Sequence, residues 1–139
     1  MNYLLDTNVI SELIVKQPNP GVIEWIDRLD PNHVFLSVIT IGELNKGIER
    51  MSASVRKDAL RDWLTTDLLT RFSGRILTLD VEVMLTWGML TGQLERIGRP
   101  LSALDSLIAA LALHHNYILA TRNERDFKDT GVNLINPWT

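Results

Sequence analysis

Tyr3-Leu4-Leu5-Asp6-Thr7-Asn8-Val9-Ile10 is the stretch that decides the fold of this chain. Residues 3–5 predict a short apolar strand, which ends at an acid, and Thr7 or Asn8 can cap the helix that follows. In open α/β sheets, reactive groups collect beyond the carboxyl ends of parallel strands. Asp6 is therefore a candidate site residue, and its alternative role is to cap the same helix.

Downstream, segments of strand and helix character alternate. We expect the first helix to stop near Val15, before a stretch rich in turn-forming residues. Further strands are expected at 33–38, 75–80, 117–120 and 132–135, the last at a sheet edge. Helices are expected at 20–29, from the turn at 40–44 through about 51, and at 54–69, 81–97 and 101–113, with a polar turn at 121–127. This order predicts an α/β sandwich around a mainly parallel sheet of four or five strands.

Length and composition restrict the class of protein. The 139 residues suit one domain spanning 1–139, and 45% hydrophobic with 22% charged residues is ordinary for a globular protein. The absence of cysteine excludes disulfides, thiolate nucleophiles and cysteine-bound zinc. No secretion signal precedes Asp6, and no apolar run approaches the ~18 residues of a membrane span, so we expect a cytoplasmic protein without membrane contact.

The formal charge of −3 argues against non-specific nucleic-acid binding, which depends on Lys and Arg neutralising phosphates. A phosphate-bearing substrate must instead meet a local basic rim or metal ions. Lys46 and Arg50, one turn beyond Glu43, are the best candidates for holding the phosphates of such a substrate, and a solvated helix face is the alternative.

Four acids stand at the starts of elements: Asp6, Glu43, Asp105 and Asp126. Each has a structural explanation. Thr40-x-x-Glu43 and Ser102-x-x-Asp105 fit capping boxes, and Asp126 fits a surface turn. Together, however, they are expected at one edge of the sheet. A pair of carboxylates ~4 Å apart repels by about 4 kcal/mol at an effective dielectric near 20, so raised pKa values or divalent cations are needed.

An all-oxygen site suits Mg²⁺ or Mn²⁺ rather than zinc, because no cysteine exists and no histidine lies near these acids in the sequence. Such a site favours attack of water on a phosphodiester with metal assistance. Asn8, Thr121 and Asn123 are expected to hold carboxylates or waters in place.

Four blocks of the chain closely resemble those of the PIN-domain family, and more narrowly the VapC-type toxins of bacterial toxin–antitoxin pairs. The blocks are Leu5-Asp6-Thr7-Asn8-Val9-Ile10-Ser11-Glu12, Ile41-Gly42-Glu43-Leu44, Asp105-Ser106-Leu107-Ile108-Ala109-Ala110 and Ala120-Thr121-Arg122-Asn123-Glu124-Arg125-Asp126-Phe127. They occur in order along essentially the whole chain, which ends in Asn136-Pro137-Trp138-Thr139.

The resemblance implies a three-layer α/β/α PIN domain and a Mg²⁺-dependent endoribonuclease, in which Mn²⁺ can substitute. It implies a toxin that cleaves RNA, with transfer RNA the expected target, to inhibit translation and growth. It further implies a homodimer and a VapB-type antitoxin, which covers the acidic cleft with its tail and binds operator DNA with its other end.

Carried over by block, the resemblance implies that Asp6 and Asp105 are the main metal ligands and that Glu43 holds a second metal or a water. Some relatives carry the fourth acid at the position of Asn123 and others at that of Asp126. We expect Asp126 at this position, with Asn123 as a hydrogen-bonding neighbour at the metal site.

Two other functions compete. An aspartyl phosphatase of the haloacid dehalogenase type also places an Asp after the first strand, but it needs a second acid two residues on, where this chain has Asn8. A degenerate PIN domain would only bind antitoxin or RNA, and its expected mark is a lost acid, whereas Asp6, Glu43 and Asp105 are all present.

Overall fold

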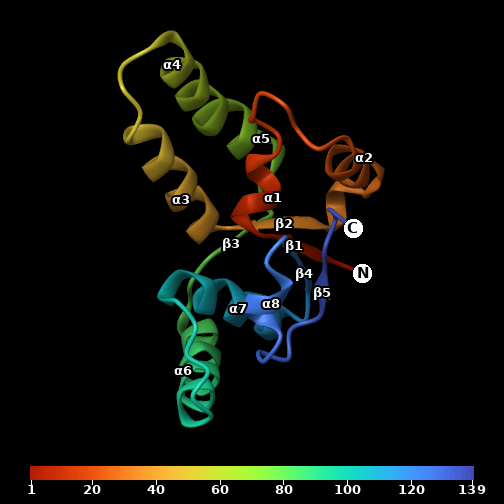
Figure 1. The fold of residues 1–139 in the computed structure, drawn as a ribbon, viewed down its shortest axis with the longest axis vertical. Coiled ribbons are helices and arrows are strands. Elements are labelled where there is room, and N and C mark those ends of the chain that lie inside the picture. The colour runs from red at the N-terminus through yellow and green to blue at the C-terminus, as the bar shows by residue number, and fades with distance from the viewer.

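The computed structural model describes residues 1–139 as one parallel sheet with helices on both faces (Figure 1). The five strands run in the order β3-β2-β1-β4-β5, and every neighbouring pair is parallel. Their bounds are β1 Tyr3–Leu5, β2 Val34–Ser37, β3 Ile76–Leu77, β4 Ile118–Ala120 and β5 Leu134–Ile135. The expected mainly parallel sheet of four or five strands is confirmed, with β5 at an edge.

The order of the strands creates a switch point beside β1. The chain starts in the middle of the sheet, moves outward through β2 and β3, and returns to the other side of β1 as β4. Leu4 pairs with Phe35 on one side of β1 and with Leu119 on the other. Connections leave β1 and β4 in opposite directions at this point, which is where open α/β sheets leave a crevice.

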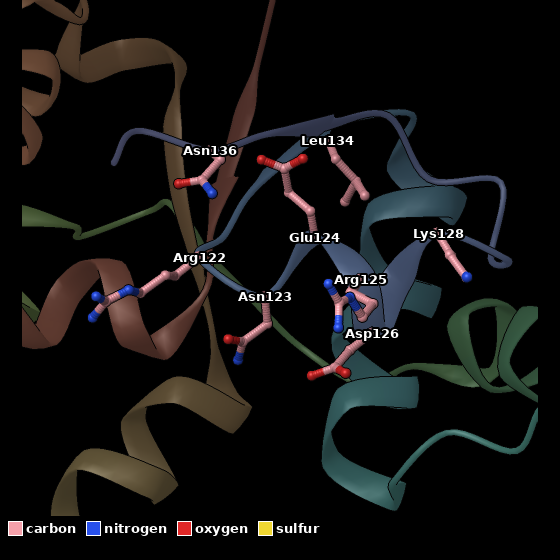
Figure 2. A pocket seen from close by; sticks show the side chains of 8 residues that line it. All are labelled: Arg122, Asn123, Glu124, Arg125, Asp126, Lys128, Leu134 and Asn136. Carbon is pink, nitrogen blue, oxygen red and sulfur yellow. The ribbon is translucent and has the colours of Figure 1, made fainter. Parts of the chain in front are cut away.

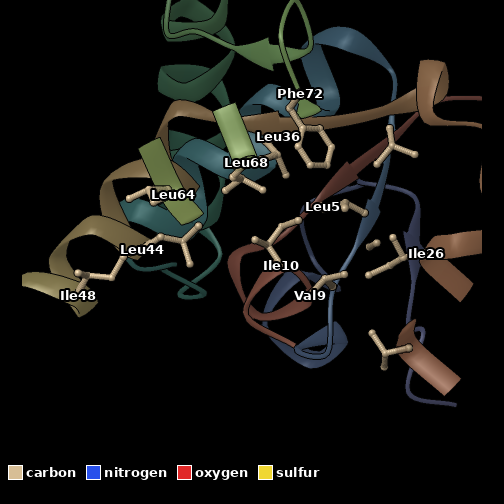
Figure 3. Packing of buried hydrophobic residues seen from close by; sticks show 13 residues of the cluster. Leu5, Val9, Ile10, Ile26, Leu36, Leu44, Ile48, Leu64, Leu68 and Phe72 are labelled. Atoms are coloured by element: carbon tan, nitrogen blue, oxygen red, sulfur yellow. The ribbon is translucent and has the colours of Figure 1, made fainter. Parts of the chain in front are cut away.

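The two layers of helices follow from the alternation of side chains along the central strand. Successive strand residues point to opposite faces, and both Leu4 and Leu5 are completely buried. Leu5 packs in a core of 13 residues that includes Val9 and Ile10, and Leu4 packs in a separate core of 11 residues (Figure 3 shows the first).

Each face has its own helices. The core around Leu5 is covered by α1 Thr7–Ser11, α2 Pro20–Arg28, α3 Val38–Glu49 and a helical segment made of α4 Val55–Asp62, a π-helical turn η2 Trp63–Leu68 and α5 Leu69–Arg71. The core around Leu4 is covered by α6 Val81–Arg96, α7 Ala103–His115 and the short α8 Glu124–Phe127. A 3₁₀ turn, η1 Pro31–His33, leads into β2.

Several expected bounds are wrong, and the strand expected at 75–80 is only the two-residue β3. The first helix ends at Ser11 rather than near Val15, because the next amides, Glu12 to Ile14, bond to carbonyls three residues back and tighten the chain into turns. The third helix starts at Val38, because Ser37 rather than Thr40 is its cap. The segment 121–127 contains a helix, α8, where only a turn was expected.

None of the helices combines the length and the apolar character that crossing a membrane requires.

Candidate active site

Asp6 lies where β1 ends, beside β4, and its carboxylate is held on both oxygens. The side chain is only 4% exposed and forms the N-cap of α1. Oδ1 accepts the Thr7 backbone N–H at 2.7 Å, and Oδ2 accepts the Thr121 hydroxyl at 2.8 Å and the Asn8 amide at 3.4 Å. Asp6 is therefore the cap of α1, and the side chains of Asn8 and Thr121 contact its carboxylate.

The charge of Asp6 is strongly perturbed. The pKa of Asp6 is raised to about 6, mainly by burial and to a smaller extent by the negative charges of Asp105 and Glu43, while hydrogen bonds from Thr121 and Thr7 oppose the rise. Three of the four predicted acids thus act on one another across the carboxyl end of the sheet. A neighbouring cation would stabilise the ionised form that burial disfavours.

Glu43 reaches this place from the first turns of α3. Its Oε1 accepts the Thr7 hydroxyl at 2.6 Å. Because that hydroxyl has a single proton, the 2.9 Å contact between Thr7 and Thr40 is donated by Thr40. Glu43 is therefore tied to α1 and makes no hydrogen bond back to the start of its own helix, so the proposed Thr40–Glu43 capping box is wrong.

Asp105 stands in the first turn of α7, on the other face of the sheet from Glu43. The predicted cap at Ser102 is present in half, since its hydroxyl accepts the Asp105 backbone N–H at 3.4 Å, and the Asp105 carboxylate makes no hydrogen bond or ion pair. The next residue, Ser106, accepts the Trp87 indole N–H at 2.8 Å and donates to the Ala103 carbonyl at 2.7 Å. Together these two hydrogen bonds hold the first turn of α7, which carries Asp105, against α6.

The last block follows β4 directly. The Asn123 N–H donates to the Thr121 hydroxyl at 3.0 Å, so Asn123 is linked through one side chain to Asp6. The Asp126 N–H donates to the Asn123 carbonyl at 3.0 Å. Figure 2 shows the Asn123 and Asp126 side chains on the same side of the segment, whereas Glu124 points toward β5. Asp126 lies in an adjoining depression and is not among the charges that shift the pKa of Asp6.

The donor set fits a hard divalent cation, with few direct protein ligands. No group of three or more Asp, Glu or His side chains is arranged so that it could hold a metal ion by itself. Mg²⁺ usually keeps several waters and takes only one or two carboxylates from the protein. The mutual repulsion of Asp6, Asp105 and Glu43 is the feature that such a cation would relieve.

Several residues of this network escaped the sequence analysis. The Thr7 hydroxyl and Thr40 connect α1 to α3, and Trp87 with Ser106 connect α6 to α7. Thr7 and Ser106 adjoin predicted acids in the sequence, which was the available signal. The sequence pattern predicts a helix cap at Thr40, which hides its contact with Thr7. Nothing in the sequence pairs Trp87 with Ser106.

The fold and the site define an α/β protein with an acidic, oxygen-rich site at the carboxyl end of a parallel sheet. The model of the PIN domain family matches residues 3–133. The plasmid stability protein StbB of Pseudomonas syringae pv. tomato is 39% identical over 135 residues, the VapC ribonuclease Y4jK of Sinorhizobium fredii 36% and the toxin FitB of Neisseria gonorrhoeae 38%, each with at least 96% of both chains covered. A more distant relative, 26% identical over 141 residues, is the tRNA(fMet)-specific endonuclease VapC of Shigella flexneri.

Solved structures give the same result. A structure of FitAB bound to a DNA fragment matches with a TM-score of 0.94 at 36% identity, over 99% of this chain and 96% of the other. The crystal structure of FitAcB from Neisseria gonorrhoeae matches with a TM-score of 0.93 at 38% identity, over 98% of both chains. The chain belongs to the PIN-domain family and, within it, to the VapC-type toxin ribonucleases.

Proposed function

We propose that this protein is a Mg²⁺-dependent endoribonuclease and the toxin of a VapBC-type pair. The observation that carries the proposal is the buried Asp6, whose pKa is raised to about 6 by burial and by Asp105 and Glu43 at the switch point of the sheet. Membership of the family supplies the reaction class. Mn²⁺ can replace Mg²⁺ because both prefer oxygen ligands.

Each residue then has a role that its position or its contacts support. Asp6 and Asp105 are the metal ligands, and Glu43, held by the Thr7 hydroxyl, orients a water or a second ion. Asn8, Thr121 and Asn123 restrain the Asp6 carboxylate directly or through one another. When bound, Mg²⁺ supplies charge for the phosphate oxygens and lowers the pKa of the attacking water.

We propose Asp126 as the fourth carboxylate. Of the two acids in the last block, Glu124 points toward β5, and Asp126 lies on the same side as Asn123 (Figure 2). Asn123 remains the hydrogen-bonding neighbour, through its backbone bond to Thr121.

The substrate and partners follow from the relatives. The tRNA-specific relative supports transfer RNA as the target, cleaved to inhibit translation and growth in the cytoplasm. The FitAB structure with DNA supports a VapB-type antitoxin that neutralises this chain and contacts operator DNA. We also propose a homodimer, since Val81, Leu85 and Met89 leave one face of α6 apolar, at 72%, 66% and 57% exposure.

The competing functions have less support. The aspartyl phosphatase needs an acid at position 8, and the amide of Asn8 instead donates to Asp6 and contacts Thr121. A degenerate PIN domain has no reason to keep an ionisable group with a raised pKa beside two other acids.

The test is to incubate the purified, antitoxin-free protein with total bacterial RNA in Mg²⁺ or Mn²⁺ and to sequence the new ends. We expect discrete cuts, concentrated in transfer RNA and abolished by EDTA. Folded, partner-free protein that leaves all RNA intact would contradict the nuclease, and cuts confined to other RNAs would contradict the target.

A further inference from the structure

A wide depression lies beside the site, at the carboxyl ends of β4 and β5 (Figure 2). Its volume is about 680 Å³, and one apolar residue, Leu134, takes part in its lining. The other lining residues are Arg122, Asn123, Glu124, Arg125, Asp126, Lys128 and Asn136. Such a polar hollow is unlike the apolar grooves that take up peptide helices.

The depression is continuous with the site through the backbone. The Arg122 N–H donates to Asn8 Oδ1 at 3.3 Å, and the Asn123 N–H donates to Thr121 Oγ1 at 3.0 Å. Asn8 and Thr121 are the side chains that hold the Asp6 carboxylate. A chain of phosphates that leaves Asp6 in this direction therefore enters the depression at once.

The cations of the depression are free to bind a ligand. Arg122, Arg125 and Lys128 form no ion pair and no side-chain hydrogen bond within the protein. By contrast, Arg75 donates to backbone carbonyls, including that of Val34, and Arg61 pairs with Glu49 at 2.9 Å. Those two arginines are engaged in hydrogen bonds or ion pairs within the protein, whereas the three cations of the depression have neither.

Arg122 is also held in place. Its guanidinium carbon lies 5.2 Å from the centre of the Trp138 ring, so the group rests on an aromatic face while its N–H donors stay open. The depression has three cations against the two acids Glu124 and Asp126, in a chain of net charge −3. It is thus a local basic area in an acidic protein.

The geometry points to a binding subsite for the sugar–phosphate backbone of RNA in this depression, where Arg122, Arg125 and Lys128 hold phosphates on one side of the scissile bond. Arginine forks match phosphate oxygens in pairs, and lysine adds a point charge. The subsite rests on the proposed ribonuclease function. A smaller groove of about 220 Å³, lined by Lys46, Arg50 and Glu43 among others, lies at α3 and α7. This groove could take the RNA strand on the other side of the scissile bond.

The test compares RNA affinity in the inactive Asp105→Asn background. Arg125→Gln with Lys128→Gln removes two charges from the depression. Lys16→Gln with Arg96→Gln is the matched control, because these two cations are exposed and unpaired elsewhere. The probe is a labelled single-stranded RNA of mixed sequence, titrated by fluorescence anisotropy at several salt concentrations. We expect the dissociation constant to rise about tenfold and the salt slope to flatten by about 1.4, which is two single-strand phosphate contacts.

The control pair should change neither quantity appreciably. Equal affinity and slope for both pairs would overturn the subsite, and so would a loss of antitoxin capture with RNA binding intact, which would make the depression a peptide site. Cleavage by the otherwise unsubstituted protein, measured in parallel, separates the two proposals. If the wild-type protein cleaves RNA but Arg125→Gln with Lys128→Gln does not change RNA affinity, the proposed function stands and the subsite is contradicted. If the wild-type protein neither cleaves nor binds RNA, both proposals are contradicted.

Discussion

Asp6 combines two requirements that conflict in the metal-free protein. Its position caps α1 and joins the ends of β1 and β4, but its burial at 4% exposure makes the ionised form costly. Three donors, Thr7, Asn8 and Thr121, compensate in part. The remaining cost is acceptable if the proposed cation binds here, because function often uses residues that are not optimal for stability.

This cost predicts a pH dependence of stability in EDTA. The folded pKa of about 6 lies above the ordinary value of 3.8, so the folded state binds the Asp6 proton more tightly than the unfolded chain does. The contribution of Asp6 is therefore least favourable above pH 6 and improves as the pH falls toward 4, by about 3 kcal/mol. Urea unfolding of the wild type and of Asp6→Asn across this pH range gives the free energy of unfolding as a function of pH. The difference between the two profiles is the contribution of Asp6. Parallel profiles would show that Asp6 titrates normally.

The fourth acid is tested by two substitutions in the last block. We expect Asp126→Asn to reduce RNA cleavage about 100-fold through loss of a charge near the reacting phosphate, and Asn123→Ala to reduce it about tenfold. Initial rates on one defined RNA, with circular dichroism to check folding, rank the two variants. The reverse ranking would place the fourth site residue at position 123.

The sequence predicts which types of residue lie at the candidate site better than it predicts the contacts between them. Asp6, Glu43 and Asp105 are proposed from the sequence because acids after parallel strands share one sheet edge, and in the structure the charges of Asp105 and Glu43 act on Asp6. The hydrogen bond from Thr7 to Glu43 joins residues 36 positions apart, and its geometry depends on the packing of α1 on α3. Local patterns in a single sequence do not contain that information.

The helices α6 and α7 form the element that positions Asp105. The Trp87 indole N–H donates to Ser106, which is 1% exposed, and Ser106 donates to the carbonyl of Ala103 in the first turn of α7. A rigid turn at this point keeps the Asp105 carboxylate facing the end of the sheet. The packing of these two helices is therefore part of the site.

Ser106→Ala tests this arrangement. It leaves the Trp87 N–H without its partner, so we expect a loss of about 1–2 kcal/mol in the free energy of unfolding. We also expect a lower kcat with little change in KM, because Asp105 is less well held. Thr65→Ala is the control, since the Thr65 hydroxyl donates to the Arg61 carbonyl on an exposed helix face and its loss should cost less than about 0.5 kcal/mol. Equal effects of the two substitutions on kcat would contradict the positioning role.

The boundaries of elements show where sequence patterns fail. The strands and long helices were predictable because apolar runs and 3.6-residue spacing extend over many residues. The cap of α3 was assigned to Thr40, although Ser37 fits the same rule three residues earlier. The strand expected at 75–80 is only two residues long as β3, whereas the four-residue helix α8 is too short to give a periodic signal and is held by Phe127 in the core.

The whole molecule presents one apolar helix face to solvent. Val81, Leu85 and Met89 are spaced by four residues along α6, opposite the buried Val83, Leu90 and Leu94. Figure 1 shows α6 extending away from the sheet. We therefore expect the free protein to be a dimer through this face.

Leu85→Glu should convert that dimer to a monomer without unfolding it, because Leu85 is 66% exposed in the single chain. Light scattering coupled to size-exclusion chromatography measures the mass directly. Val55→Glu is the control, since Val55 is 88% exposed on α4, away from the α6 face. A monomeric wild type, or a dimer that survives Leu85→Glu, would contradict this interface.

The proposed function requires the carboxylates at the end of the sheet to act together on RNA. The most direct measurement is the Mg²⁺-dependent rate of RNA cleavage by the wild type and by Asp105→Asn, prepared identically and compared for thermal unfolding. We expect a loss of at least about 100-fold in this rate with no loss of stability, because Asp105 repels Asp6 and makes no hydrogen bond with its carboxylate. Unchanged cleavage by folded Asp105→Asn would rule out this joint action.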